Sequence, residues 1–123
     1  MPTSVLVIDD STMVRMQVGN ALRPHGYDVV EAIDGVDALA MLDAHPNTAL
    51  VVCDVNMPRM NGLEFLEQLR ARPTRPPVVM LTTEGQPELI QRAKALGALG
   101  WLVKPFKPEI LTATAKKLAP TGT

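Results

Sequence analysis

Five short apolar runs, separated by longer segments of helical periodicity, decide what this chain can fold into. The runs are residues 5–8, 27–32, 49–53, 77–81 and 101–103. Four of them are almost entirely apolar, which is typical of strands that are covered on both faces. The run at 27–32 alternates more between apolar and polar residues, so we expect that strand nearer an edge of its sheet.

The segments between these runs carry the signals of helix starts and of buried helix faces. Residues suited to the first position or the cap of a helix precede each segment: Ser11, Asp34, Asn61, Pro87 and Pro108. Apolar residues then recur at helical spacing, and we expect them to face the core: Val14, Val18 and Leu22; Val36, Leu39 and Ala40; Leu63, Leu66 and Leu69; Ile90, Ala93 and Leu96; Ile110, Leu111 and Leu118.

A strand followed by a helix, repeated five times, predicts an α/β fold. Such a pattern gives a parallel sheet with right-handed crossovers and with helices on both faces. The 123 residues fit one domain, and no linker or change of composition divides them. We therefore expect residues 1–123 to form a single domain without an attached output domain.

The composition excludes several classes of function. Hydrophobic residues make up 46% and charged residues 20%, and the net charge is −1, so nothing predicts a nucleic-acid partner. No apolar run approaches the ~18 residues of a membrane span, and the N-terminus lacks a signal pattern, so no membrane insertion is expected. The single cysteine, Cys53, cannot form an intramolecular disulfide. These features predict a cytoplasmic location.

Polar side chains follow four of the five apolar runs, at the points where the strands should end. They are Asp9 and Asp10 after the first, Asp54 after the third, Thr82 and Thr83 after the fourth, and Lys104 after the fifth. Ligands bind at the carboxyl edge of open parallel sheets, and these strand ends should meet there. The sequence therefore predicts a site built from three carboxylates, hydroxyl groups and one ammonium.

Three carboxylates at one edge need compensating charge. Two of them about 4 Å apart repel by roughly 4 kcal/mol at an effective dielectric constant of 20. Lys104 supplies only one positive charge, so a hard divalent cation such as Mg²⁺, which prefers oxygen ligands, would complete the balance. A zinc site is not expected, because Cys53, His25 and His45 lie apart in the sequence and the histidines fit surface or turn positions.

The expected groups together favour phosphoryl transfer. That reaction needs positioning and charge stabilisation around the moving phosphoryl group. An aspartate can act as the nucleophile and form an acyl phosphate. We interpret Asp9 and Asp10 as residues that hold a metal ion for the third aspartate, Asp54.

Four stretches of the sequence resemble one known family. "VLVIDDS", "VVCDVNMPRMNGLEFL", "PVVMLTTE" and "GWLVKPF" stand in the order and spacing of the receiver domains of two-component response regulators. The chain is similar to the single-domain, CheY-like members of that family. The resemblance spans nearly the whole chain and implies a flavodoxin-like (βα)5 doubly wound sheet with strand order 2-1-3-4-5.

The resemblance also implies a phosphorylation site and its metal ligands. Asp54 falls at the position of the phosphoacceptor. Asp10 is expected to bind Mg²⁺ directly and Asp9 mainly through water. Asp54 and the backbone carbonyl of Asn56 complete the protein ligands. Mn²⁺ is expected to substitute for Mg²⁺.

Further roles follow from the same resemblance. Lys104 falls at the lysine that contacts the phosphoryl group, and the Lys104–Pro105 bond is expected to be cis. Thr82 falls at the switch hydroxyl, and Asn56 and Glu84 fall where the family tunes dephosphorylation. Trp101 departs from the Tyr or Phe usual at its position. Two alternatives stay open for this larger side chain: it rotates inward on activation, or it packs at the sheet edge.

The resemblance implies a signalling phosphoacceptor rather than an enzyme, although it promotes its own phosphorylation and dephosphorylation. The donor would be a sensor histidine kinase or a phosphotransfer domain. A downstream protein would read the surface from Glu84 through Trp101 to the last helix, in chemotaxis or motility signalling, or the domain would act as a phosphate sink. We expect a monomer, with a weak dimer as the alternative.

Three other functions remain as alternatives. One is an unphosphorylated interaction domain of the same fold. Another is an aspartate-nucleophile phosphatase of the haloacid dehalogenase type, which needs a second carboxylate two residues after its nucleophile. Asp9 and Asp54 are followed at that distance by Ser11 and Asn56. The last is a flavodoxin that binds FMN, but "DDSTMVRM" supplies acid where a glycine- and hydroxyl-rich phosphate loop is needed.

Overall fold

The computed structural model describes residues 3–73, 75–83 and 85–121. The predicted alternation of strands and helices is confirmed, and the elements follow one another as β1 (Thr3–Ile8), α1 (Thr12–Leu22), the short 3₁₀ helix η1 (Arg23–His25), β2 (Tyr27–Ala32), α2 (Gly35–Ala44), β3 (Thr48–Cys53), α3 (Gly62–Arg70), β4 (Val78–Thr82), α4 (Pro87–Ala95), β5 (Gly100–Val103) and α5 (Pro108–Leu118). All strand pairs are parallel, and the order is β2-β1-β3-β4-β5, as the family resemblance implied.

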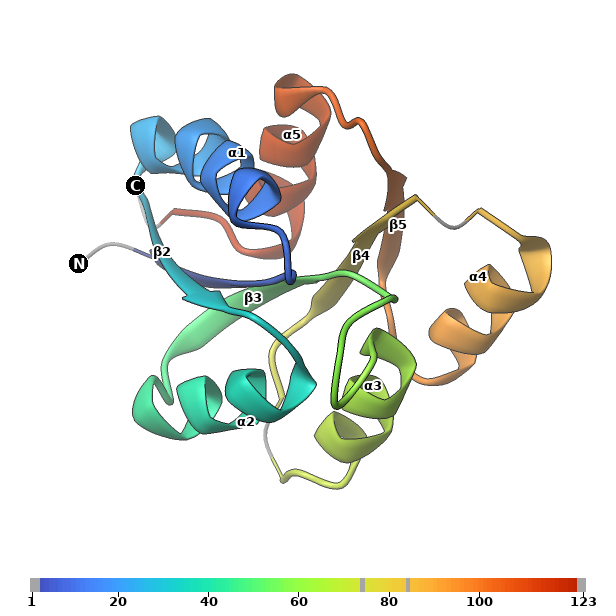
Figure 1. The fold of residues 1–123 in the computed structure, drawn as a ribbon. Coiled ribbons are helices and arrows are strands. Elements are labelled where there is room, and N and C mark those ends of the chain that lie inside the picture. The colour runs from blue at the N-terminus through green and yellow to red at the C-terminus, as the bar shows by residue number, and fades with distance from the viewer. Residues whose placement is uncertain (1–2, 74, 84, 122–123) are drawn as a thin grey trace.

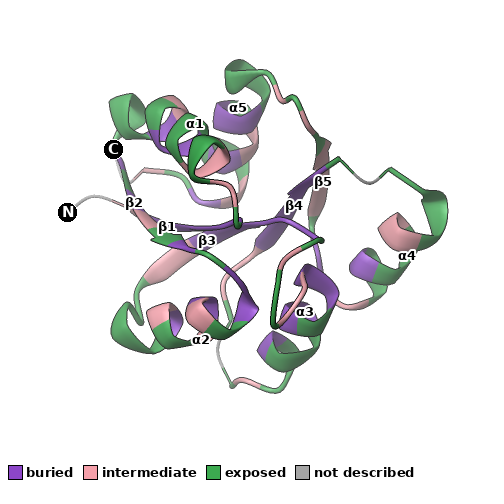
Figure 2. Cartoon of the chain, in the orientation of Figure 1, coloured by how far each residue is buried: buried purple, intermediate pink, exposed green. Residues whose placement is uncertain are grey.

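Helices cover both faces of the sheet. Figure 1 shows α1 and α5 against one face and α2, α3 and α4 against the other. Successive strand residues point to opposite faces, so each strand contributes to two cores. On β1, Leu6 and Ile8 pack on the α2–α4 side, whereas Val5 and Val7 pack with α1 and α5. Figure 2 shows the buried residues concentrated in the three central strands and on the inner sides of the helices.

Both edges of the sheet are partly open. β2 is one edge strand, as its alternating sequence predicted. β5 is the other edge, and here the prediction of a strand covered on both faces is wrong. No residue of β5 is fully buried, and Val103 is 52% exposed. Its apolar sequence could not reveal this exposure, because the run does not show that β5 lies at the edge of the sheet, paired within the described residues with β4 alone.

The predicted helix starts are confirmed. The side chains of Ser11, Asp34 and Asn61 each accept a hydrogen bond from the backbone N–H three residues later. The Asn61 cap is reciprocal, because the Glu64 side chain accepts from the Asn61 N–H. Pro87 and Pro108 are the first residues of α4 and α5, where a missing N–H costs nothing.

The buried faces of two helices differ from those predicted. In α2 the buried residues are Gly35, Ala38 and Leu42, whereas Val36 and Ala40 of the predicted face are exposed. In α5, Leu111 is buried but Ile110 is 48% exposed. Periodicity identified a helix but could not distinguish two neighbouring stripes. At the start of α2, Gly35 lies against the Met60 side chain, which would have to shift to admit a Cβ.

Among the described residues, no helix is both long and apolar enough to cross a membrane.

The corrected face of α2 predicts a contrast between two substitutions. Leu42→Ala should lower the free energy of unfolding by about 2–5 kcal/mol, because the Leu42 side chain is only 5% exposed and its truncation leaves a cavity in the core. Val36→Ala should change it by only about 0.5 kcal/mol, because Val36 is 42% exposed. Urea unfolding of both variants measures the difference, and equal losses would contradict the assignment.

The ion pair at the start of α2 predicts a pH dependence of stability. Burial alone would raise the pKa of Asp34, but hydrogen bonds from Arg59 and the Asp37 N–H lower it below its usual value. A lowered pKa in the folded state stabilises the fold above the unfolded-state pKa, and this contribution is lost as the pH falls through the folded-state pKa.

Asp34→Asn should therefore cost about 1 kcal/mol at pH 6, a modest value because Arg59 is largely exposed. Its difference from the parent should shrink as the pH falls towards 3, because protonation of Asp34 in the unfolded state then removes the preference of its charged form for the folded state. Urea unfolding at the two pH values tests this, and a penalty that grows on acidification would refute it.

Candidate functional site

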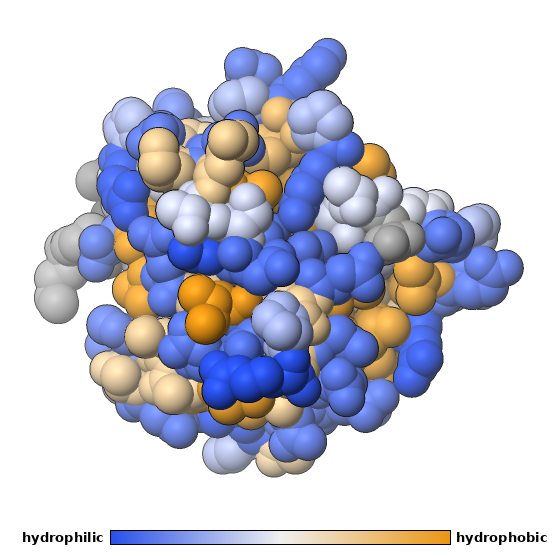
Figure 3. Space-filling model, viewed as in Figure 1, coloured by the Kyte–Doolittle hydropathy of each residue, from blue (hydrophilic) through white to orange (hydrophobic). Residues whose placement is uncertain are grey.

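The three predicted carboxylates meet at the carboxyl edge of the sheet. Ile8 and Cys53 are paired across β1 and β3, so the next residues, Asp9 and Asp54, lie side by side. One carboxylate oxygen from each of Asp9, Asp10 and Asp54 lies within 4.8 Å of the other two. Figure 3 views this face of the molecule, where hydrophilic surface crosses the middle and apolar side chains border it.

The three acids differ in environment. Asp9 and Asp54 are buried, with 2% and 6% of their surface exposed, whereas Asp10 faces solvent. The pKa of Asp9 is raised, mainly because the carboxyl group is buried and also because the Asp54 charge lies nearby. Hydrogen bonds from Lys104 and from the Ser11 N–H lower this pKa but do not outweigh the burial. The cluster thus places negative charge where water cannot fully solvate it.

Lys104 bridges the two buried acids. Its Nζ donates to Asp9 Oδ2 at 2.7 Å and to Asp54 Oδ2 at 3.3 Å. Burial alone would lower the pKa of Lys104, but the Asp9 hydrogen bond and the charges of Asp54 and Asp9 outweigh it and raise the pKa. The side chain therefore remains an ammonium at neutral pH. The Lys104–Pro105 peptide bond is cis, as predicted.

Backbone contacts fix the Asp54 side chain and its loop. The Val55 N–H donates to Asp54 Oδ1 at 2.7 Å, and the Asp54 N–H donates to the Ile8 carbonyl at 2.9 Å. A Cβ on Gly62 would overlap the Asp54 carbonyl oxygen, so no larger residue fits there. Gly62 was not predicted as a site residue, because its only local signal is its place after the Asn61 cap.

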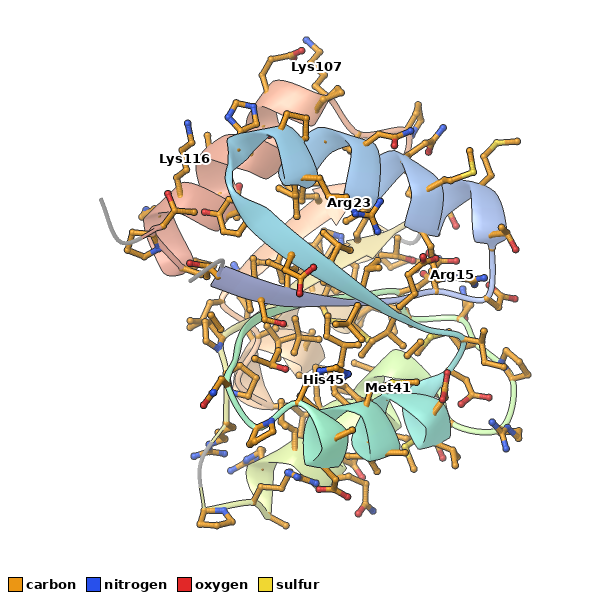
Figure 4. The ribbon with its side chains drawn as sticks, turned by 90° about the vertical axis from the view of Figure 1, so that its left-hand side faces the viewer. Arg15, Arg23, Met41, His45, Lys107 and Lys116 are labelled. Atoms are coloured by element: carbon orange, nitrogen blue, oxygen red, sulfur yellow. The ribbon has the colours of Figure 1, made fainter. Side chains whose placement is uncertain are left out.

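Two arginines near the site were also missed. Arg15 Nη1 donates to the Asp9 carbonyl at 2.6 Å, and its Nε donates to Glu31 Oε1 at 3.0 Å. Figure 4 shows Arg15 between α1 and the end of β2. Arg59, in the loop after Asp54, forms an ion pair with Asp34. Neither arginine had a sequence signal, because the ion-pair partners Glu31 and Asp34 lie 16 and 25 positions away along the chain and the contact of Arg15 to Asp9 is to a backbone carbonyl.

The hydroxyl and tuning residues lie on and after the neighbouring strands. Thr82 is fully buried and is the last residue of β4, which begins and ends one position later than the strand we predicted at 77–81. The Lys104 N–H donates to the Thr82 carbonyl at 2.9 Å, which ties the two site residues together. Asn56 is exposed in the loop after Asp54. Glu84 lies outside the described residues.

Trp101 packs at the edge of the sheet. It faces Met80 across the β4–β5 pair and lies partly buried with Leu89 and Leu96 against the core on the α2–α4 side. Its indole nitrogen is buried and has no hydrogen-bond acceptor in the part of the chain that the structure describes. This arrangement matches one of the two open alternatives and does not test the other, rotation on activation.

Cys53 is a packing residue, although it adjoins Asp54. Its side chain is completely buried. Burial, together with the charges of Asp54 and Asp9, raises the pKa of its thiol well above the usual value. The thiol therefore stays protonated, which does not favour redox or nucleophilic chemistry.

The donor set fits a hard divalent cation. Asp9, Asp10 and Asp54 offer oxygen atoms only, and Lys104 offsets one of their three charges. Oxygen donors with a residual negative charge suit Mg²⁺ or Mn²⁺ rather than zinc, which favours nitrogen and sulfur ligands. His25 and His45 are exposed, as predicted, and are not part of this cluster.

Comparison with known families identifies one match. The model of the response regulator receiver domain matches residues 5–116. Chemotaxis protein CheY1 of Helicobacter pylori is 44% identical over 111 residues, which cover 87% of this chain and 89% of that protein. A chemotaxis protein CheY homolog of Campylobacter jejuni is 38% identical over 122 residues, or 96% of this chain and 93% of that protein.

Solved structures agree in fold. The chemotaxis protein CheY4 of Vibrio cholerae has a TM-score of 0.86 and 42% identity, covering 96% of this chain and 99% of that one. The CheX–CheY–BeF3–Mg²⁺ complex of Borrelia burgdorferi contains a chain with a TM-score of 0.89 and 26% identity, covering 95% of this chain and 89% of that one.

The acidic cluster predicts that a divalent cation stabilises the fold. Mg²⁺ at ten times its dissociation constant should raise the free energy of unfolding by about 1.4 kcal/mol, because it binds the folded state alone. Asp10→Asn should be more stable than the parent without metal, since one like charge is gone, and should gain little from Mg²⁺. Asp28→Asn on β2 is the matched control.

Urea unfolding with and without Mg²⁺ measures both effects. Equal stabilisation of the parent and of Asp10→Asn would contradict a metal site at this cluster.

Proposed function

The chain belongs to the response regulator receiver family, and on that premise we propose that Asp54 accepts a phosphoryl group from a phosphohistidine. The observation that carries the proposal is the shared ammonium: Lys104 Nζ contacts both Asp9 and Asp54 beside a third carboxylate. Phosphoryl transfer to a carboxylate requires a nucleophilic aspartate, a lysine held beside it and a pair of acidic residues that can bind a metal ion.

The transfer exchanges one bond to phosphorus for another. A carboxylate oxygen of Asp54 attacks phosphorus in line, and the bond between phosphorus and the donor's imidazole nitrogen breaks. The electron pair stays on that nitrogen, and a proton on the other ring nitrogen lets the imidazole leave as a neutral ring. Asp54 becomes an acyl phosphate, and water later hydrolyses it to the carboxylate and inorganic phosphate.

Lys104 stabilises charge on the transferred group. Its raised pKa keeps it cationic, and its contact to Asp54 Oδ2 at 3.3 Å already brings it beside the acceptor. Bound Mg²⁺, for which Mn²⁺ can substitute, would supply further positive charge, with Asp9, Asp10, Asp54 and the Asn56 carbonyl as its protein ligands. Asn56 and Glu84 are the residues that we expect to tune hydrolysis.

Thr82 links the new charge to the surface. A phosphoryl group adds a charge of about −2, which can accept a hydrogen bond from the Thr82 hydroxyl worth roughly 1.5–3 kcal/mol. That energy shifts a two-state equilibrium by about 10- to 150-fold, which is enough for a reversible switch. β4 pairs with β5, so movement at Thr82 can reach Trp101 and the surface of α4, β5 and α5.

The partners are proteins. We propose a sensor histidine kinase or a phosphotransfer domain as donor and a target that reads the α4–β5–α5 surface. The similarity to chemotaxis proteins supports motility signalling, with a phosphate sink as the second candidate. The net charge of −1 gives no support to nucleic-acid binding. We expect a cytoplasmic monomer that acts as a phosphoacceptor, not as an enzyme with its own substrate.

Intact-mass measurement after incubation with acetyl phosphate and Mg²⁺ tests the proposal. The parent should gain one phosphoryl group, and Asp54→Asn should gain none, nor should the parent with the metal chelated. Asp43→Asn, an exposed acid at the end of α2, should behave as the parent. Trp101 fluorescence in the same samples reports whether the switch surface responds.

Three results would count against the proposal. An adduct that persists in Asp54→Asn would show another acceptor. No adduct, together with no response to beryllofluoride, would favour the unphosphorylated interaction domain. Turnover of a phosphomonoester that survives loss of Asp54 would favour the phosphatase.

A further inference from the structure

The loop between β3 and α3 contains a residue with an unusual backbone. Arg59 has φ of +62° and is the one non-glycine residue with positive φ among those described. Across it, the Met60 N–H donates to the Pro58 carbonyl at 2.6 Å, the bond pattern of a three-residue turn. Three-residue turns with positive φ are rare and strained, and a strained residue persists only where surrounding contacts determine its conformation.

The Arg59 side chain makes such contacts. Its Nε donates to Asp34 Oδ2 at 2.7 Å, and its Nη2 donates to Asp34 Oδ1 at 3.2 Å. Two parallel hydrogen bonds fix the orientation of a guanidinium as well as its position. Asp34 is 1% exposed and its Oδ1 also caps α2, so the anchor is itself rigid.

A second contact fastens the same turn. The Gly35 N–H donates to the Met60 carbonyl at 3.1 Å. Met60 side-chain atoms lie 2.6 to 2.9 Å from where a Cβ on Gly35 would stand. At the far end of the loop, the Gly62 N–H donates to the Val55 carbonyl at 2.8 Å. Residues 56–61 are thus held at both ends, by α2 and by the start of α3.

We propose that Arg59 is a positioning residue for the metal site: it ties the loop that carries Asn56 to the start of α2, so that the Asn56 carbonyl and the Asp54 carboxylate keep one arrangement. This inference rests on the proposed function. Arg59 touches none of the three clustered acids, and it acts through the backbone of its loop. Its side chain is 58% exposed, so truncation removes little buried apolar surface and tests the tether itself.

Three variants separate the tether from other effects. Arg59→Ala removes the guanidinium. Arg59→Gly also removes it but adopts positive φ without cost, so it isolates the side-chain contact from backbone strain. Arg72→Ala is the matched control. Arg72 also forms an arginine–aspartate ion pair, with Asp43, but this pair lies near the amino-terminal ends of β3 and β4, away from the acidic cluster.

Two measurements follow. Amide hydrogen exchange of residues 55–62 in the metal-free proteins should be about tenfold faster in both Arg59 variants and parent-like in Arg72→Ala. The Mg²⁺ concentration that half-saturates phosphorylation by acetyl phosphate should rise on the order of tenfold in both, with the rate at saturating Mg²⁺ unchanged. Asp34→Asn should give the same rise, and combining it with Arg59→Ala should add nothing further.

Parent-like exchange or a parent-like Mg²⁺ requirement in Arg59→Gly would overturn the inference. A lower maximal rate without a change in the Mg²⁺ requirement would also overturn it, because that result indicates a structural role alone. Failure of the proposed function would look different: the parent and Arg72→Ala would gain no phosphoryl group. The exchange measurement alone would then support or overturn the tether.

Discussion

The repulsion among three carboxylates, only partly offset by one ammonium, is the constraint around which this site is built. Two parallel strands that pair at Ile8 and Cys53 deliver Asp9 and Asp54 to the same point, and Asp10 joins them. Lys104 donates to both buried acids, but a residual negative charge remains. A fold whose total stability is about 5–15 kcal/mol tolerates such a cluster only if the surrounding structure holds it. This unbalanced charge is the reason why we propose that the site binds a divalent cation and, through the cation, a phosphoryl group.

The architecture supplies what the cluster needs from distant parts of the chain. Lys104 lies 95 positions from Asp9, and it reaches the cluster because β4 and β5 extend the sheet beyond β3. The same arrangement puts buried Thr82 between the acidic cluster and the β5 surface that carries Trp101. On the other side, Gly62 and the Arg59–Asp34 pair hold the loop after Asp54. Of the three clustered acids, only Asp10 is exposed to solvent, and Asp9 and Asp54 are buried behind it.

Some of this was predictable from the sequence, and the reasons are physical. The helix caps Ser11, Asp34 and Asn61 accept hydrogen bonds from residues three positions away, so the local sequence was enough to predict them. The acids and Lys104 follow apolar runs, and the rule that parallel strands end at one edge brought them together. Hydrophobic periodicity could not predict the exposure of β5 or which face of α2 is buried, because both depend on the elements that pack against them in the folded chain. Gly62, Arg15 and Arg59 were missed because their roles lie in contacts that only the folded chain creates, with the backbone of Asp54 and Asp9 and with the Asp34 side chain.

The most direct test of the central claim is chemical identification of the phosphorylated side chain. Borohydride reduces an acyl phosphate to an alcohol, so a protein phosphorylated on Asp54 would carry homoserine at that position, which peptide mass spectrometry can locate. We predict homoserine at residue 54 alone, only after incubation with both Mg²⁺ and phosphodonor, with Asp9 and Asp10 unchanged. Homoserine at residue 9 or 10, or phosphate retained on a serine or threonine, would contradict the account.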